Sequence, residues 1–269
     1  MPIEWLLYPL LGMVAGVLAG LLGVGGGLVL VAALVLLLPA QGVPADAAMH
    51  AALATSLASV VVTACASTLA HHRRGGVVWP SVAWLLPGLL LGGLAGSFIA
   101  KDIAGNALRW FVVGYCLLAA LQLALGLPRR SGTAIAPPGA SPTPVGPGLS
   151  LAGIVIGAVS ALVGIGGGSM TVPLLVWRGV SPVRAVGSSS ACGIAIGLSA
   201  ALGYASGGAI PGMPAGSVGY VYLPAAIGIA ITSLLMAPVG ASLAHRVSPL
   251  ALKRIFAAFL LAMAAVLAA

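Results

Sequence analysis

Apolar stretches long enough to enter or cross a lipid bilayer follow one another along almost the whole chain. They cover residues 3–22, 26–39, 45–70, 77–100, 107–127, 149–163, 167–178, 184–205, 218–244 and 250–269. A helix needs about 20 apolar residues to span the hydrocarbon layer. Only 11 basic and 3 acidic residues occur among 269, whereas about a quarter of the residues in a soluble domain are charged. These features predict an all-α polytopic membrane protein in a lipid bilayer and exclude a disordered chain.

One segment breaks this pattern near the middle of the chain. Residues 128–148 are rich in proline, glycine and serine and have no apolar periodicity, which is typical of a linker. We therefore predict a first transmembrane repeat over 1–127, a cytoplasmic linker over 128–148 and a second transmembrane repeat over 149–269.

The two sides of the linker carry the same landmarks in the same order. Leu22–Gly27 matches Val163–Gly168 with four glycines in common positions, and Ala52–Ser56 matches Ala185–Ser189. An internal duplication of this kind is typical of many transporter folds.

The basic residues predict which loops face the cytoplasm. If the loop at 71–76 is inside, as the positive-inside rule suggests, the linker and the 178–184 loop are inside too. Nine basic residues then lie inside, at positions 73, 74, 129, 130, 178, 184, 246, 253 and 254. Lys101 and Arg109 lie outside with all three acids. This partition accounts for the whole net charge of +8.

The same partition limits what lies between the linker and the 178–184 loop. Only about 30 residues separate these two inside segments, and two full spans need about 40. Residues 149–178 are therefore predicted to form a hairpin that enters from the cytoplasm, and 3–39 its partner from outside. The predicted fold is two inverted repeats, each a glycine-tipped broken-helix hairpin plus three transmembrane helices.

The glycine tips of the hairpins are the candidate binding site. A bend between two half-helices leaves backbone N–H groups unpaired, and these bind anions together with the positive helix N-termini. Hydroxyl donors lie nearby, since Ser169 and Thr171 follow the second tip. The predicted substrate-binding residues are Gly25, Gly26, Gly27, Thr55, Ser56, Gly166, Gly167, Gly168, Ser169, Ser188 and Ser189. A phosphate-binding P-loop is excluded because no Gly-Lys-Ser/Thr follows either tip.

Glycines also serve close packing of membrane helices, and this alternative stays open for the tips. It is preferred for two other series with small-xxx-small spacing. These are Gly12, Gly16 and Gly20, and Gly88, Gly92 and Gly96.

Ionisable residues are scarce within the apolar stretches. Glu4, Asp46 and Asp102 all lie near span ends, which disfavours a cation site built on carboxylates. His50 and Arg184 are the candidates for gating or proton coupling. The alternatives are a hydrogen-bonded histidine near the membrane surface and an interfacial arginine anchor.

Other function classes find little support. The basic residues form no water-facing patch, so we expect no nucleic acid. The cysteines, Cys65, Cys116 and Cys192, have no metal-ligand spacing and the histidines are scattered, so neither a metal nor a cofactor is predicted. Cys192 follows the serines at 188–190 and could approach a pore, although packing is the simpler role. A Ser-His enzyme is disfavoured because no nucleophile elbow is present.

The motifs together resemble the sulfite exporter TauE/SafE family of bacterial inner-membrane transporters over the whole chain. The resemblance rests on Gly23–Gly27, Ala54–Leu57, His71–Gly75, Gly164–Gly168, Pro182–Ser189 and Leu252–Ala257. It implies a multi-pass protein of the bacterial inner membrane that exports a small sulfur-containing oxyanion, sulfite or an organosulfonate, by alternating access. The alternative is a membrane accessory protein that supplies an anion or a metal to a partner without coupled transport. Assembly into a homo-oligomer is left open.

Overall fold

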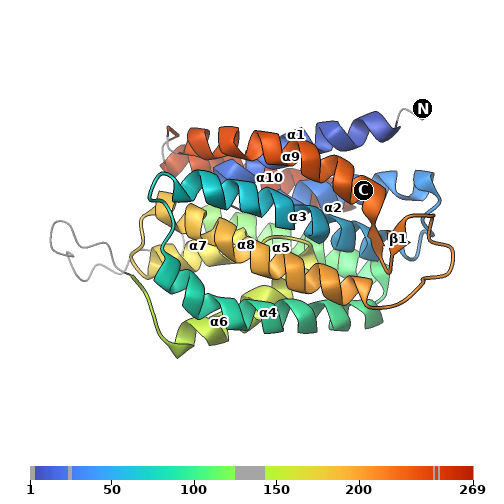
Figure 1. Ribbon diagram of the computed structural model, residues 1–269, viewed down its shortest axis with the longest axis horizontal. Helices are drawn as coiled ribbons and strands as arrows, with labels where there is room; N and C mark the ends of the chain where they lie inside the picture. The colour runs from blue at the N-terminus through green and yellow to red at the C-terminus, as the bar shows by residue number, and fades with distance from the viewer. Residues whose placement is uncertain (1–3, 24–25, 125–142, 245, 248, 269) are drawn as a thin grey trace.

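The computed structural model describes residues 4–23, 26–124, 143–244, 246–247 and 249–268, and the helices run roughly parallel to one long axis (Figure 1). The elements in chain order are α1 (Glu4–Leu22), α2 (Gly27–Leu37), the 3-10 helix η1 (Pro39–Gln41), α3 (Ala48–His72), α4 (Trp79–Asp102), α5 (Gly105–Ala124), α6 (Pro147–Val163), α7 (Gly168–Trp177), α8 (Pro182–Ala205), β1 (Ser217–Val218), β2 (Val221–Tyr222), α9 (Leu223–Ala244) and α10 (Pro249–Ala268). The prediction of an all-α membrane protein is confirmed for the described residues, apart from a short hairpin formed by the two-residue strands β1 and β2.

Helix breaks occur at both predicted glycine tips. The α1 helix ends at Leu22 and α2 begins at Gly27, while α6 ends at Val163 and α7 begins at Gly168. The returning helices α2 and α7 contain 11 and 10 residues. At 1.5 Å per residue they extend only about 15–17 Å, roughly half of a bilayer's hydrocarbon thickness. The breaks therefore lie deep within the helical layer.

Two pairs of helices pack with their backbones in close contact, α1 against α9 and α4 against α6. A Cβ on Gly20 would fall 2.1 Å from the carbonyl oxygen of Ala237, and one on Gly92 would fall 2.1 Å from that of Ile154. Gly12, Gly16, Gly88 and Gly96 make contacts of the same kind. The predicted packing role of both small-residue series is thus confirmed.

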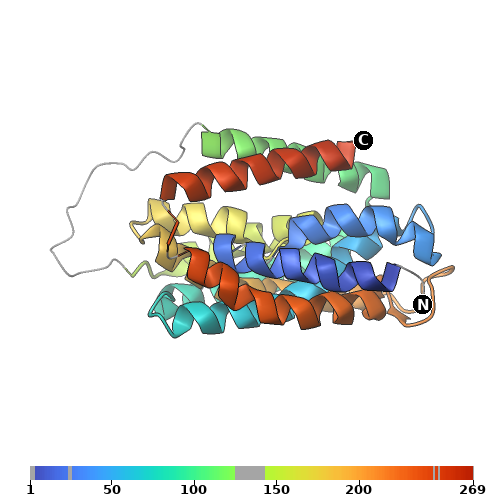
Figure 2. The same ribbon diagram turned by 90° about the horizontal axis from the view of Figure 1, so that it is seen from above.

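Long helices α3 and α8 form the centre of the bundle, where they contact each other and α9 or α4. By length and composition, α3, α4, α8 and α9 can each cross a membrane. The sequence predicts six full spans. Four of them are these helices, and the other two correspond to α5 and α10, which have 20 residues each. These two helices lie side by side along one flank (Figure 2), joined by a hydrogen bond from Arg109 to the carbonyl of Leu267.

The helix ends gather at two opposite faces of the molecule. At the left of Figure 1, α3, α7 and α9 end and α4, α6, α8 and α10 begin. At the right, α2, α4, α8 and α10 end and α1, α3, α5 and α9 begin. Arg73, Arg74, Arg178 and Arg246 immediately follow helices that end at the left face.

Candidate functional site

The two glycine turns meet in the interior. A Cβ on Gly27 would fall 2.2 Å from the carbonyl oxygen of Gly164, so the first turn contacts the second backbone to backbone. Gly23 and Gly26 have φ values of 69°, and Gly164 and Gly167 have 77° and 76°. Residues with a Cβ rarely adopt this left-handed region, which explains why each break requires glycine.

Serines on the central helices join each half to the turn of the other half. The Ser56 hydroxyl on α3 donates to the carbonyl of Gly27 (2.9 Å) and to that of Gly164 (3.1 Å), sharing its hydrogen between them. Ser189 on α8 donates to the carbonyl of Gly23 (2.9 Å). Since Ser56 matches Ser189 and Gly23 matches Gly164 in the repeat, these cross-links are equivalent. Both serines are fully buried.

The residues before these serines orient the next helix of the opposite half. The Thr55 hydroxyl accepts a hydrogen bond from the backbone N–H of Tyr222 (3.0 Å), directly before α9. The Ser188 hydroxyl accepts one from the N–H of Val78 (2.8 Å), directly before α4, and donates to the carbonyl of Arg184 (2.8 Å). The bond between Thr55 and Tyr222 and the bond between Ser188 and Val78 are therefore equivalent in the two halves, like the residues that form them.

These bonds determine what the predicted hydroxyls can do in this conformation. The hydroxyl hydrogens of Ser56, Ser188 and Ser189 already point to carbonyl oxygens, so they are not free for an anion. Among the hydrogen bonds of the described residues, Thr55 Oγ1 only accepts. Gly26, Gly27, Gly166, Gly167 and Gly168 lie at the turns as predicted, while Gly25 falls outside the described residues.

The second turn has polar neighbours that the repeat does not predict. Ser160 on α6 and Thr171 on α7 are fully buried, and their hydroxyls have no hydrogen-bond partner. Ser160 Oγ lies 3.4 Å from the position that a Cβ on Gly167 would occupy. Sequence reasoning noted Thr171 but missed Ser160, because the repeat match that found the other hydroxyls places Ala19 opposite Ser160. The sequence feature that could have identified Ser160 is its position four residues before Gly164, one helical turn before the break.

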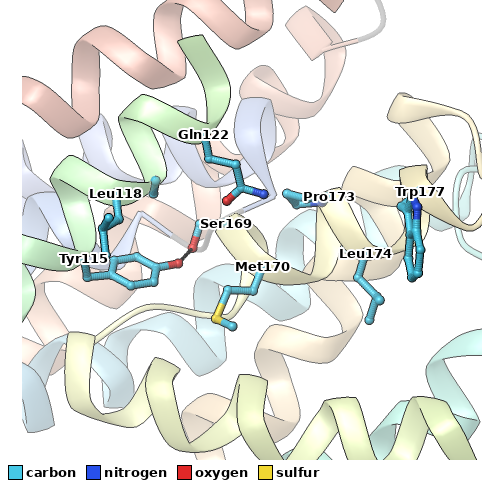
Figure 3. Close-up of a pocket in the computed structure, with 9 residues that line it drawn as sticks. Tyr115, Leu118, Gln122, Ser169, Met170, Pro173, Leu174 and Trp177 are labelled. Carbon is cyan, nitrogen blue, oxygen red and sulfur yellow. Dashed lines mark hydrogen bonds between the residues drawn. The ribbon is translucent and has the colours of Figure 1, made fainter. Parts of the chain in front are cut away.

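A cleft of about 650 Å³ between α5 and α7 reaches the start of α7 (Figure 3). Ser169, the second residue of α7, forms a hydrogen bond with the Tyr115 hydroxyl at this point. Gln122 is a further polar lining residue, and the remaining lining side chains are apolar. The structure thus places Ser169 at the end of a cleft beside the second turn.

His50 lies away from the turns, in a second cavity of about 940 Å³ at the end of the molecule where α3 begins. Its Nε2 lies 3.1 Å and 3.0 Å from the carbonyl oxygens of Ala100 and Ile103. Because carbonyls only accept, Nε2 carries the hydrogen and Nδ1 is the acceptor in the neutral ring. Nδ1 is buried without a partner, and the ring stacks on Tyr220 at 5.1 Å. The cavity is also lined by Asp46, Lys101, Asp102 and Asn106.

Arg184 lies in the first turn of α8, at the opposite face from His50. Its side chain is partly buried, and its Nε has no hydrogen-bond partner. Cys192 is fully buried in the core, as a packing role requires. In the described part of the chain, no cluster of three or more histidine, cysteine or acidic residues could hold a metal ion.

Comparisons with known proteins identify a family for the chain. Residues 8–267 match the sequence model of the family described as "Sulfite exporter TauE/SafE". A "probable membrane transporter protein" of Haemophilus influenzae is 39% identical over 264 residues, which cover 96% of each chain. One of Xylella fastidiosa is 35% identical over 72% of this chain and 71% of its own, and one of Methanocaldococcus jannaschii is 25% identical over 91% and 89%.

No solved structure matches this chain. The names of the family and of the relatives describe membrane transporters, not enzymes. The apolar helices agree with a multi-pass membrane protein.

Proposed function

Since the chain belongs to the sulfite exporter TauE/SafE family, we propose that this membrane transporter exports a small sulfur-containing oxyanion. Sulfite is the preferred substrate and an organosulfonate the next. The site we propose consists of the two glycine turns with Thr55, Ser56, Ser169, Ser188 and Ser189. Ser56, Ser188 and Ser189 would contact the anion in a conformation in which their hydroxyls leave the carbonyl oxygens that they bond to here. The proposed location is the inner membrane of a bacterium. The proposed partners are the lipid bilayer and the substrate, and assembly into a homo-oligomer is left open.

The observation that carries this proposal is a pair of glycine turns that meet inside a bundle without acidic residues nearby. All three acids of the chain occur at positions 4, 46 and 102, at or close to helix ends. Helices α2 and α7 begin at the turns, so the positive ends of two helix dipoles lie at the same depth. Backbone N–H groups and helix N-termini attract an anion without a formal charge in the bilayer.

An inverted arrangement of the halves supports alternating access. The α1–α2 hairpin begins and ends at the right face of Figure 1, whereas α6 begins and α7 ends at the left face. The pairing of α1 with α9 and of α4 with α6 agrees with a two-fold relation between the halves. Export needs no ATP site, because a negative interior drives an anion outward with about 2.3 kcal/mol per charge per 100 mV.

His50 and Arg184 are proposed as gating or proton-coupling residues at opposite ends of the path. His50 is proposed because it lines the second cavity and its Nδ1 has no hydrogen-bond partner among the described residues. The guanidinium of Arg184 would attract the anion at the cytoplasmic entrance, where the positive-inside rule places α8's first turn.

The decisive experiment is sulfite flux by the purified protein in proteoliposomes. We expect outward flux that increases with an inside-negative potential, and loss of this flux in Gly167→Val. A β-branched side chain at a φ of 76° is strained, so the folded state of the variant is checked by size-exclusion chromatography and circular dichroism. Unchanged flux in a folded variant would rule out the second turn as part of the site.

The alternative is an accessory protein that supplies an anion or a metal to a partner. Such a protein would bind its ligand in detergent but move none across the membrane alone. Binding without flux in the same preparation would therefore favour this alternative.

A further inference from the structure

The two glycine turns differ in the atoms that surround them. At the first turn, the atom nearest to a Cβ on Gly23, Gly26 or Gly27 is in each case a backbone carbonyl oxygen, at 2.7, 2.3 and 2.2 Å. At the second turn, the atoms nearest to a Cβ on Gly164 or Gly167 are side-chain methyl carbons. Two of these oxygens, those of Val186 and Ala15, lie outside the second turn. Carbonyl oxygens carry partial negative charge, so the surroundings of the first turn are unfavourable for an anion.

Hydrogen-bond donors show the same difference. Next to the second turn, Ser160 and Thr171 have buried hydroxyls without partners. Continuing the repeat match places Ala19 and Leu30 at the corresponding positions of the first turn, and both are apolar and buried. A buried hydroxyl without a partner loses its hydrogen bonds to water, so both hydroxyls are available to a ligand at the second turn.

The backbone of the second turn adds further donors. Met170 and Thr171 both donate to the carbonyl of Gly167, at 3.1 and 2.8 Å. The N–H groups of Gly167, Gly168 and Ser169 donate to no acceptor among the described residues. They are the unpaired first-turn groups of α7, at the positive end of its dipole.

We propose that a single oxyanion binds at the second turn, held by the N–H groups of Gly167–Ser169 and by the Ser160 and Thr171 hydroxyls. This inference rests on the proposed anion transport and narrows its site. The first turn is structural: its carbonyls receive the Ser56 and Ser189 hydroxyls and hold the halves together. Ser169 also lines the cleft between α5 and α7, so this cleft reaches one residue of the proposed site.

All the donors at this site are uncharged, and this determines the charge of the anion. The free energy of transferring an ion from water to a low-dielectric interior rises with the square of its charge. The energy of the hydrogen bonds that the ion gains in the site rises more slowly with its charge. A singly charged oxyanion, such as hydrogensulfite or an alkanesulfonate, is therefore preferred to a doubly charged one such as sulfate.

The test compares anion binding by the purified full-length protein and three variants, using isothermal titration with methanesulfonate and with sulfate. Ser160→Ala and Thr171→Val remove the free hydroxyls with little change in volume. Ser67→Ala is the matched control, since it removes a buried hydroxyl at the α3–α8 contact whose partner, Ser190, keeps a second bond to Val186.

We expect methanesulfonate affinity to fall about tenfold in each turn variant and less than twofold in Ser67→Ala. We expect sulfate to bind the unmodified protein at least tenfold more weakly than methanesulfonate. Equal affinity in all variants, preferential binding of sulfate, or no binding of either anion would overturn the inference. If binding follows this pattern but proteoliposomes show no flux, the inference stands and the proposed transport function fails.

Discussion

At the residue scale, the most informative contacts are those of Ser56 and Ser189. Each serine donates to a glycine carbonyl far away in the sequence, at separations of 108 and 166 residues. These carbonyls lie at helix breaks, where the next turn of a helix does not supply a donor. The hydroxyls therefore satisfy backbone groups that would otherwise be buried without a partner.

Loss of either hydroxyl should destabilise the folded protein. We expect Ser56→Ala and Ser189→Ala each to lower the free energy of unfolding by about 1–3 kcal/mol, because a buried carbonyl loses its donor. Thermal unfolding in detergent measures this effect. Ser199→Ala on α8 is the control, since within the described part of the chain its hydroxyl bonds to Ile196 of its own helix alone. A loss in Ser199→Ala equal to that in Ser189→Ala would contradict the explanation.

At the element scale, stability depends on the close backbone contacts of α1 with α9 and of α4 with α6. In lipid, helices gain little from burying apolar surface against each other, so van der Waals contact at small residues becomes the main source of association. The sequence predicted these glycine series correctly because their spacing of four is a local pattern.

A single methyl group at such a contact should separate the helices. Gly92→Ala would place its Cβ 2.1 Å from the carbonyl oxygen of Ile154, and we expect a loss of about 1–3 kcal/mol. Gly114→Ala on α5 has no heavy atom within 4 Å of its new Cβ and should be neutral or slightly stabilising. Equal melting temperatures for both variants would show that the α4–α6 contact is not tight.

At the scale of the whole molecule, the basic residues and the two opposite faces predict one orientation. Exposed positions on the two faces distinguish it, namely Arg73 after α3 and Ala215 before β1. In a variant without the three native cysteines, we expect Arg73→Cys to react with an impermeant thiol reagent only from the cytoplasm. Ala215→Cys should react only from outside. Labelling of both from one side would contradict the proposed inverted arrangement.

Several features followed from the sequence alone because they depend on local pattern. The scarcity of charge indicated lipid as the solvent, and glycine runs that interrupt apolar stretches located both helix breaks at the correct residues. The repeat match also found Thr55, Ser56, Ser188 and Ser189, since these residues occur in both halves.

Only the tertiary structure decided what these residues contact. Hydroxyl groups bond to whichever carbonyl lies within about 3 Å, and for Ser56 and Ser189 that carbonyl belongs to the other half of the chain. Ser160 could not emerge from the repeat because alanine occupies the matching position. The difference between the two turns likewise arises from neighbours brought together by folding, since their glycines are nearly identical in sequence.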